Sequence, residues 1–315
     1  MNWINQAIQE LLTTDNDELS SRIEIIEKDY NLVGTQTTAH FYFIKLDANG
    51  YLRRKDLLQY VARKIVDYSI PKIEKDAARE YLITHGSTAK ILELAEKAKK
   101  LFTELDKTGE LGEMLLYILT ESVLKLPQLI SKMTLKTSGK LHYQGADGIH
   151  FNYNEVDDVL DLYWGESKME KTLTKALANC FDSLAPFLLN PNSYDSTQNR
   201  DLQLITSNIS ENINNPKLED YLVKFLDLDS DFSNRLNFKG LCFIGFDVNN
   251  YPINPKEKKT EDLFAEFTDK LQSWKKSITT QLNNHVNIEK FEIIVFLMPF
   301  DSVESMRNDF LKLLK

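Results

Sequence analysis

The sequence has little of what disulfide-rich and zinc-binding proteins depend on. Its 315 residues include two cysteines and five histidines, and neither type is spaced as a zinc site requires. Cys180 and Cys242 lie far apart in apolar surroundings, so we expect two small core residues rather than a disulfide framework. This cysteine usage excludes small secreted scaffolds and predicts a cytoplasmic protein.

Long apolar runs are also missing. No stretch approaches the roughly 18 uninterrupted apolar residues of a membrane helix. The opening residues Met1–Gln6 have neither the basic start nor the apolar run of a signal peptide. Hydrophobic residues make up 42% of the chain and charged residues 27%, which is ordinary for a globular protein. We therefore expect one elaborated domain or two, with a large core.

Positive charge is in deficit overall but concentrated in one segment. The formal net charge of −9 argues against tight autonomous binding to nucleic acid, because Lys and Arg supply that affinity by neutralising phosphates. Between Glu121 and Asp147, however, the chain carries four lysines and no acid. They are Lys125, Lys132, Lys136 and Lys140. Such a stretch is usually a solvated face.

Apolar strands alternate with amphipathic helices, which predicts an α/β sheet covered on both faces. The expected strands are 23–26, 39–45, two runs around Asp147 and Glu166, 240–246 and 291–297. The expected helices are 55–66, 91–98, 109–126, 169–188, 218–226, 260–283 and 303–314, with a loop at 190–199. Residues 1–100 are predicted to form an N-terminal α+β region and a candidate partner interface, and residues 101–315 the domain that carries the motifs.

Two acids and a lysine interrupt two strand-like runs near the middle of the chain. Asp147 lies in Gly-Ala-Asp-Gly-Ile-His, and Glu166 and Lys168 lie in Leu-Tyr-Trp-Gly-Glu-Ser-Lys. The acids are 166 − 147 = 19 residues apart, a spacing that suits antiparallel neighbours whose facing side chains come about 5 Å apart. Glu166 and Lys168 are an i, i+2 pair, so they share a face of a strand. The three side chains can therefore meet at one point.

Such a set suits phosphodiester chemistry. Mg²⁺ is typically held by one or two carboxylates, waters and a substrate phosphate, so Asp147 and Glu166 are candidate ligands. The ion would polarise the phosphodiester and lower the pKa of a bound water. Lys168 would orient that water or stabilise charge in the transition state. The alternative is a surface salt bridge of little effect, and the residues alone leave both interpretations open.

The helix that begins near Gly109 offers a further acid. Glu110 and Glu113 are three residues apart and share a face of this helix. Both lie in its first turn, where the helix dipole favours a carboxylate, and for Glu110 we prefer this capping role. Glu113 follows Gly112, a residue that often marks close approach of the backbone. Glu113 is therefore the better candidate for a water-bridged metal contact.

Other residues near the motifs are weaker candidates. His150 is three residues beyond Asp147, so strand alternation places it on the opposite face and favours a structural role. Trp164 is an aromatic residue in a strand, which is usually core. Four lysines are candidate contacts to a nucleic-acid backbone, although each one singly is typical of a solvated surface. These are Lys132, Lys136, Lys140 and Lys171.

The longer motif set resembles a known family. It comprises Gly-Glu-Leu-Gly-Glu-Met-Leu-Leu-Tyr, Leu-Pro-Gln-Leu-Ile-Ser-Lys-Met, Gly-Ala-Asp-Gly-Ile-His and Tyr-Trp-Gly-Glu-Ser-Lys, all within about residues 109–171. The set resembles the PD-(D/E)XK nuclease superfamily and, within it, the HamA component of Hachiman anti-phage defence systems. Asp147 would match the first acid of the superfamily pattern, Glu166 the second and Lys168 the lysine. One departure is Ala146, which stands where the pattern has proline.

The resemblance implies a fold, an activity and a partner. The fold would be a restriction-endonuclease-like mixed α/β sheet flanked by helices over residues 101–315. The activity would be Mg²⁺-dependent cleavage of DNA with little sequence preference, and Mn²⁺ would substitute. The partner would be a HamB-like superfamily-two helicase in a heteromeric complex, and an acidic chain that engages DNA poorly alone fits such control. Two alternatives are a non-catalytic regulatory or recruitment subunit of a helicase complex and a nuclease that cleaves RNA or tRNA.

Overall fold

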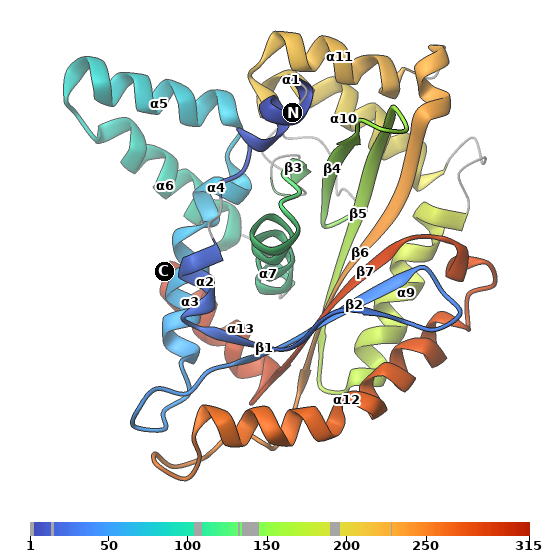
Figure 1. Cartoon of the computed structure of the whole chain (residues 1–315). Helices are drawn as coiled ribbons and strands as arrows, with labels where there is room; N and C mark the ends of the chain where they lie inside the picture. The colour runs from blue at the N-terminus through green and yellow to red at the C-terminus, as the bar shows by residue number, and fades with distance from the viewer. Residues whose placement is uncertain are drawn as a thin grey trace.

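One mixed sheet of seven strands runs through the computed structural model of the protein (Figure 1). The structure describes residues 3–13, 16–103, 109–131, 133, 145–189, 196–227 and 229–315. The strand order is β1-β2-β7-β6-β5-β4-β3. The strands are β1 (Ile23–Asn31), β2 (Thr37–Ile44), β3 (Gln128–Ser131), β4 (Gly148–Asn154), β5 (Val159–Glu170), β6 (Leu236–Asp247) and β7 (Ile293–Phe300). Strands β2, β7, β6 and β5 are parallel, and β1, β4 and β3 are antiparallel to their neighbours.

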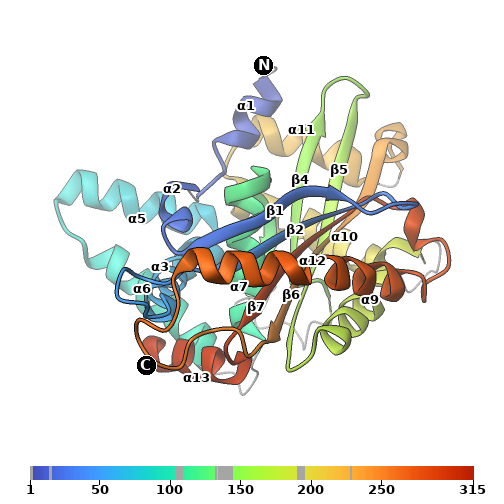
Figure 2. The same cartoon turned by 60° about the horizontal axis from the view of Figure 1, so that its bottom comes forward.

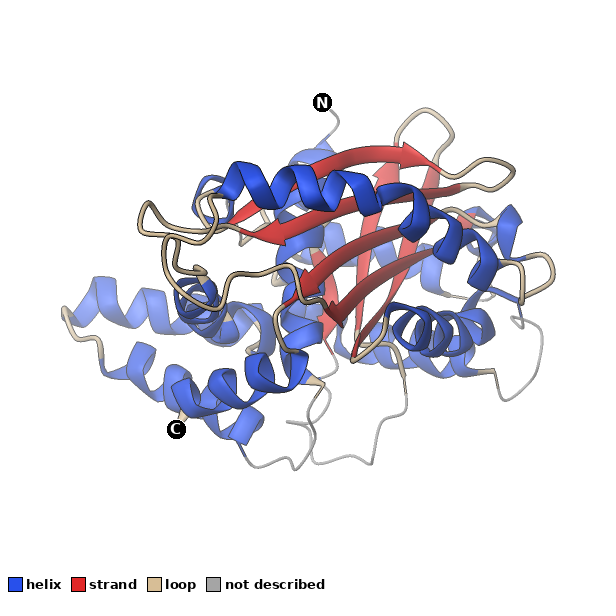
Figure 3. Cartoon of the chain, turned by 90° about the horizontal axis from the view of Figure 1, so that it is seen from below, coloured by secondary structure: helices blue, strands red, loops and turns tan. Residues whose placement is uncertain are grey.

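The central strands are apolar because helices cover the sheet on both faces (Figures 1 and 3). All residues of β7 are buried, as expected for a parallel strand without a solvated face. The side chains of β5 alternate between two helices, because Ser167 lies against α7 and Trp164 stacks with Phe187 of α9. Helices α7 and α9 therefore lie on opposite faces of the sheet. The predicted mixed α/β sheet with flanking helices is confirmed.

The helices are grouped around this sheet. Those before β3 are α1 (Trp3–Gln9), α2 (Asn16–Ser20), α3 (Arg54–Arg63), α4 (Ile65–Ser69), α5 (Lys72–His85), α6 (Ala89–Thr103) and α7 (Glu110–Leu119), which continues as the π-helical turn η1 (Thr120–Leu124). Those after β5 are α9 (Leu173–Leu189), α10 (Thr197–Ile213), α11 (Pro216–Leu226), α12 (Thr260–Leu282) and α13 (Val303–Leu314), with short 3₁₀ turns η2 (Asp231–Arg235) and η3 (Ile288–Lys290). Helices α5 and α6 form a hairpin that projects from the rest of the molecule (Figures 1 and 2).

No described helix combines the length and the apolar character that crossing a lipid bilayer requires. The N-terminal strands are part of the same sheet as the rest, since Thr37 of β2 pairs with Ile293 of β7. The division of the chain into two domains near residue 100 therefore stays a prediction. The sheet contains strands from both sides of this boundary.

Several element boundaries differ from those expected. Residues 169 and 170 belong to β5 rather than to the following helix, which begins at Leu173. The loop expected at 190–199 is wrong for its last three residues, because α10 begins at Thr197 with the Ser196 side chain as its N-cap. The helix after Gly109 ends at Leu124 rather than at the proline, because Lys125 adopts the left-handed conformation with φ 56°.

Candidate functional site

The candidate site lies at the N-terminal start of β4, where the neighbouring β5 continues past it. The two strands pair antiparallel with Gly148 opposite Gly165, so the predicted pairing is confirmed. The N–H of Asp147 donates to the Gly165 carbonyl at 2.9 Å, so Asp147 and Gly148 both lie opposite Gly165 and the regular register ends here. Beyond this point, among the described strands, β5 pairs with β6 alone as far as Glu170. We call Glu166–Glu170 the open edge of β5.

Asp147 covers part of the open edge with its carboxylate. Its Oδ2 accepts hydrogen bonds from the Ser167 N–H at 2.9 Å and from the Ser167 hydroxyl at 2.8 Å. The residue is 6% exposed, and a carboxylate so buried needs donors or cations in place of its hydration shell. The Asp147 carboxylate therefore lies beside the residue that separates Glu166 from Lys168.

Glu166 and Lys168 project from the same face of β5 and form an ion pair. The Lys168 Nζ donates to Glu166 Oε2 at 3.0 Å, and the Glu166 side chain is 6% exposed against 28% for Lys168. Burial by itself lowers the pKa of Lys168, but the carboxylates of Glu166 and Asp147 outweigh it and raise the pKa above its usual value. Lys168 is therefore cationic at neutral pH. With one partner almost fully buried, the pair differs from the exposed salt bridges that contribute little.

A glycine lets helix α7 come close to this edge. A Cβ added at Gly112 would lie 3.1 Å from Ser167 Oγ, 3.3 Å from Ser167 Cβ and 3.4 Å from Met169 Cγ. A larger residue would push α7 away from β5, so the absent side chain permits the contact. The neighbouring residue, Glu113, is thereby carried toward the open edge from the face opposite to that of α9.

Glu113 is connected to Asp147 by a tyrosine from a distant part of the chain. The Tyr68 hydroxyl lies 3.1 Å from Glu113 Oε2 and 3.1 Å from the Asp147 carbonyl oxygen. Glu113 is 7% exposed. Glu110, for which a capping role was expected, is also buried at 3%. Tyr68 precedes Asp147 by 79 residues, and no motif or spacing in the sequence marks it.

Two further side chains hold the backbone around the site, and sequence reasoning missed both. Asp201 of α10 accepts from the Ala146 N–H at 3.4 Å and from the Trp164 indole at 3.3 Å. Arg307 of α13 donates to the Met169 carbonyl on the open edge at 2.5 Å. Both contacts join elements far apart in sequence, so only the folded chain reveals them.

The remaining candidates divide into those that lie near the site and those that lie elsewhere. His150 is buried, its Nδ1 lies 2.9 Å from the Leu126 carbonyl, and burial lowers its pKa to about 4, which supports a structural role. Trp164 is fully buried in the core. Lys171 is exposed just after β5. The other lysine candidates, Lys132, Lys136 and Lys140, lie outside the described residues.

The donor set fits a hard cation that is held partly by solvent. In the part of the chain that the structure describes, no three His, Cys, Asp or Glu side chains are grouped as a protein-only metal site would need. Asp147 and Glu166 lie near one another, because the Asp147 carboxylate accepts hydrogen bonds from Ser167, the residue next to Glu166, and both carboxylates raise the pKa of Lys168. Two carboxylates are what Mg²⁺ usually takes, with waters and substrate phosphate completing an octahedron. These two residues could therefore hold Mg²⁺.

The fold and site together define a class of protein. It is a mixed α/β protein in which two acids and a lysine meet at the open edge of a central sheet, with a third acid approaching on a glycine-bearing helix. Compared with models of known families, the chain matches the HamA family over residues 20–314 and therefore belongs to it. HamA is a component of Hachiman anti-phage defence systems. None of the curated proteins compared with the chain matches it.

Proposed function

We propose that this chain is the nuclease effector of a Hachiman system, a metal-dependent endonuclease that hydrolyses DNA phosphodiester bonds with little sequence preference. The observation that carries the proposal is the gathering of Asp147, Glu166 and Lys168 at the open edge of β5. The order of elements around them supports a PD-(D/E)XK-type core, because α7 is followed by the antiparallel β3, β4 and β5, then α9 and the parallel β6.

Each residue has a distinct role in this mechanism. Asp147 and Glu166 would hold Mg²⁺, which when bound supplies Lewis-acid activation of the phosphate and a more acidic water. Lys168 is cationic because the two carboxylates raise its pKa, so it acts as a donor that orients the attacking water and stabilises negative charge on the phosphate oxygens. Glu113 is the auxiliary acid, and Asp201 fixes the backbone before Asp147.

The charge of the chain supports control by a partner. A net charge of −9 disfavours encounter with DNA, since association depends on Lys and Arg neutralising phosphates. We propose that a HamB-like helicase delivers the substrate, which restricts cleavage to DNA that the helicase has engaged.

Plasmid cleavage by variants tests the proposal. Purified protein, with and without the helicase, is incubated with plasmid and Mg²⁺. Glu166→Gln removes a candidate ligand charge and Lys168→Ala removes the donor, so each should slow cleavage by at least about 100-fold. The matched controls are Glu266→Gln and Lys258→Ala, because these residues form an ion pair at 2.6 Å that lies outside the open edge of β5.

Parent-like cleavage by Glu166→Gln and Lys168→Ala would contradict the assignment. A thermal shift assay distinguishes a metal-dependent enzyme from a non-catalytic recruitment subunit. A cation that binds only the folded protein raises the free energy of unfolding by about 2.7 kcal/mol when its concentration is 100 times the Kd. Mn²⁺ should stabilise the parent and not Asp147→Asn. Parallel assays on RNA and tRNA determine which nucleic acid is the substrate.

A further inference from the structure

Tyr68 occupies an unusual position for a residue outside the motifs. It lies on the short helix α4, its side chain is 2% exposed, and its ring packs between Phe102 of α6 and Tyr117 of α7. The ring centroids are 6.2 Å from that of Phe102 and 5.3 Å from that of Tyr117. Aromatic packing of this kind fixes the ring, so the hydroxyl has one direction available to it.

The hydroxyl points at two groups of the candidate site. Glu113 Oε2 and the Asp147 carbonyl oxygen are acceptors, each 3.1 Å away, and a phenol has one hydrogen to donate. Burial raises the pKa of Tyr68 well above its usual value, and the nearby carboxylates of Glu113 and Asp147 raise it further. Tyr68 therefore stays protonated and remains a donor over the whole working range of pH.

We infer that Tyr68 is a positioning residue, whose hydroxyl holds the Glu113 carboxylate in place beside the backbone of Asp147. The inference rests on the proposed nuclease function and adds to it the residue that orients the auxiliary acid. A Glu side chain has several rotatable bonds, and ordering it costs entropy. A donor already fixed by packing removes part of that cost at the moment of catalysis. Outer-shell partners of this kind commonly affect metal affinity or activity by 10- to 100-fold.

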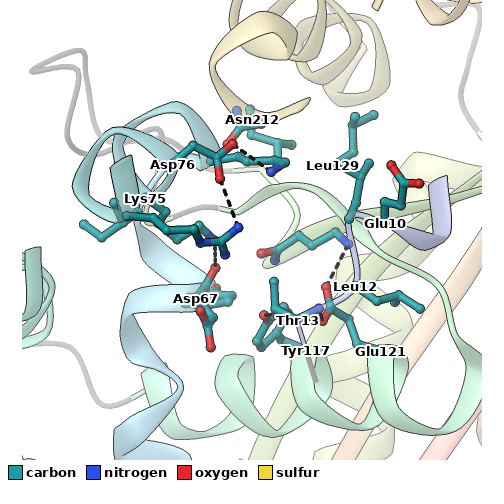
Figure 4. Close-up of a pocket in the computed structure, with 17 residues that line it drawn as sticks. Glu10, Leu12, Thr13, Asp67, Lys75, Asp76, Tyr117, Glu121, Leu129 and Asn212 are labelled. Carbon is teal, nitrogen blue, oxygen red and sulfur yellow. Dashed lines mark hydrogen bonds and ion pairs between the residues drawn. The ribbon is translucent and has the colours of Figure 1, made fainter. Parts of the chain in front are cut away.

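A neighbouring tyrosine provides a matched control. Tyr117 is equally buried, its ring touches that of Tyr68, and both residues line a cavity of about 270 Å³. The Tyr117 hydroxyl, however, pairs with Thr13 Oγ1 beside Glu121, on the wall of the cavity away from the Lys75 side (Figure 4). Replacing Tyr117 by phenylalanine removes a buried hydroxyl from the same aromatic cluster and leaves the hydrogen bonds of Tyr68 to Glu113 and Asp147 in place.

The test compares Tyr68→Phe with Tyr117→Phe in the full chain with its helicase. We expect Tyr68→Phe to keep a near-parental melting temperature, to need 10- to 100-fold more Mn²⁺ for half-maximal thermal stabilisation and cleavage, and to lose kcat with an unchanged KM for plasmid. Tyr117→Phe should keep the parental Mn²⁺ dependence and kcat. Adding Tyr68→Phe to Glu113→Gln should cause no further loss of kcat if Tyr68 acts through Glu113.

Three outcomes overturn the inference. The first is a Tyr68→Phe variant that matches the parent in Mn²⁺ midpoint and kcat. The second is an equal loss of kcat in both tyrosine variants, and the third is a double variant in which the losses of Tyr68→Phe and Glu113→Gln multiply. In each case a parent that cuts DNA leaves the nuclease proposal standing, so only the role of Tyr68 is lost. A parent that neither binds Mn²⁺ nor cuts overturns both proposals together.

Discussion

At the scale of single residues, each buried acid of the site has an identified donor. Ser167 donates to Asp147, Lys168 to Glu166, and Tyr68 to Glu113. A carboxylate shielded from water without such partners would be unstable. Each acid has a different donor, so substitutions of Ser167, Lys168 and Tyr68 should each affect a different acid.

A buried histidine gives the protein a defined response to acid. Burial lowers the pKa of His150 to about 4 from its usual 6.5. Between these two pH values the imidazole is protonated in the unfolded chain but neutral in the folded chain. The contribution of His150 to the free energy of unfolding is therefore fully present above pH 6.5. It declines as the pH falls towards 4, by about 1.4 kcal/mol per pH unit and about 3 kcal/mol in all. His40, with its pKa lowered to about 4 by burial, adds a similar loss.

Urea unfolding between pH 4 and 7.5 tests this response. His150→Asn keeps a donor near the Leu126 carbonyl but cannot titrate, so its stability should fall less steeply than that of the parent between pH 6.5 and 4. The control is His85→Asn at an exposed position, which should keep the parental slope. Identical slopes for the parent and His150→Asn would contradict a buried neutral imidazole.

Part of the site could be predicted from sequence at this scale. The i, i+2 spacing placed Glu166 and Lys168 on one face of a strand, and the structure pairs them. Tyr68 and Asp201 could not be predicted, because a lone tyrosine or aspartate carries no spacing signal. Their roles depend on tertiary structure, because α4 and α10 must first pack beside the start of β4.

At the scale of elements, the packing of α7 on β5 positions Glu113. Gly112 costs helix stability relative to alanine by roughly 1 kcal/mol, and the close contact with Ser167 explains its use. Ser167 in turn donates to Asp147. A shift of the helix would therefore be passed to the first acid as well as to Glu113.

Gly112→Val tests this packing. The added isopropyl group would overlap Ser167 and Met169, so we expect a loss of about 1–3 kcal/mol in unfolding free energy and weaker Mn²⁺ stabilisation. Lys99→Val, at an exposed site on α6, introduces a valine into a helix without this contact and should cost less than about 1 kcal/mol. By helix propensity alone, Gly112→Val would be neutral or slightly stabilising, so an unfolding free energy of Gly112→Val equal to or above that of the parent would contradict the close contact.

Periodicity predicted most strands and long helices, but it failed where contacts decide the structure. Strand β3 has only four residues, which is too short to show an alternating pattern in the sequence. It is a strand because it pairs with β4. The residues Ser, Thr, Gln and Asn at the start of α10 are typical of turns and therefore predict a loop. The same residues are typical of helix N-caps, and Ser196 fills that role.

At the scale of the whole molecule, the N-terminal region is part of the structure that forms the candidate site. Strand β2 pairs with β7 at the centre of the sheet, and α4 supplies Tyr68 to the site. A partner that contacts the first hundred residues would thus act on elements that touch the acids directly. The predicted partner interface and the candidate site need not be separate.

A fragment of residues 101–315 tests the predicted division of the chain. Because it leaves the edge of β7 uncovered and lacks Tyr68, we expect it to associate through exposed strand edges and to lose Mn²⁺ stabilisation. Size-exclusion chromatography and thermal unfolding measure both. A monomeric fragment that unfolds cooperatively and binds Mn²⁺ as the full chain does would establish an independent domain.

The pairing of β2 with β7 also bears on how the protein is made. Thr37 and Ile293, which are paired in register, are 293 − 37 = 256 residues apart, so the ribosome must deliver the residues up to β7 before the middle of the sheet can close. Such long-range pairing forms late and slowly. Nascent or prematurely terminated chains that lack β7 therefore lack a finished sheet, and if the proposed function holds, a cell that makes this protein would be protected from incomplete copies.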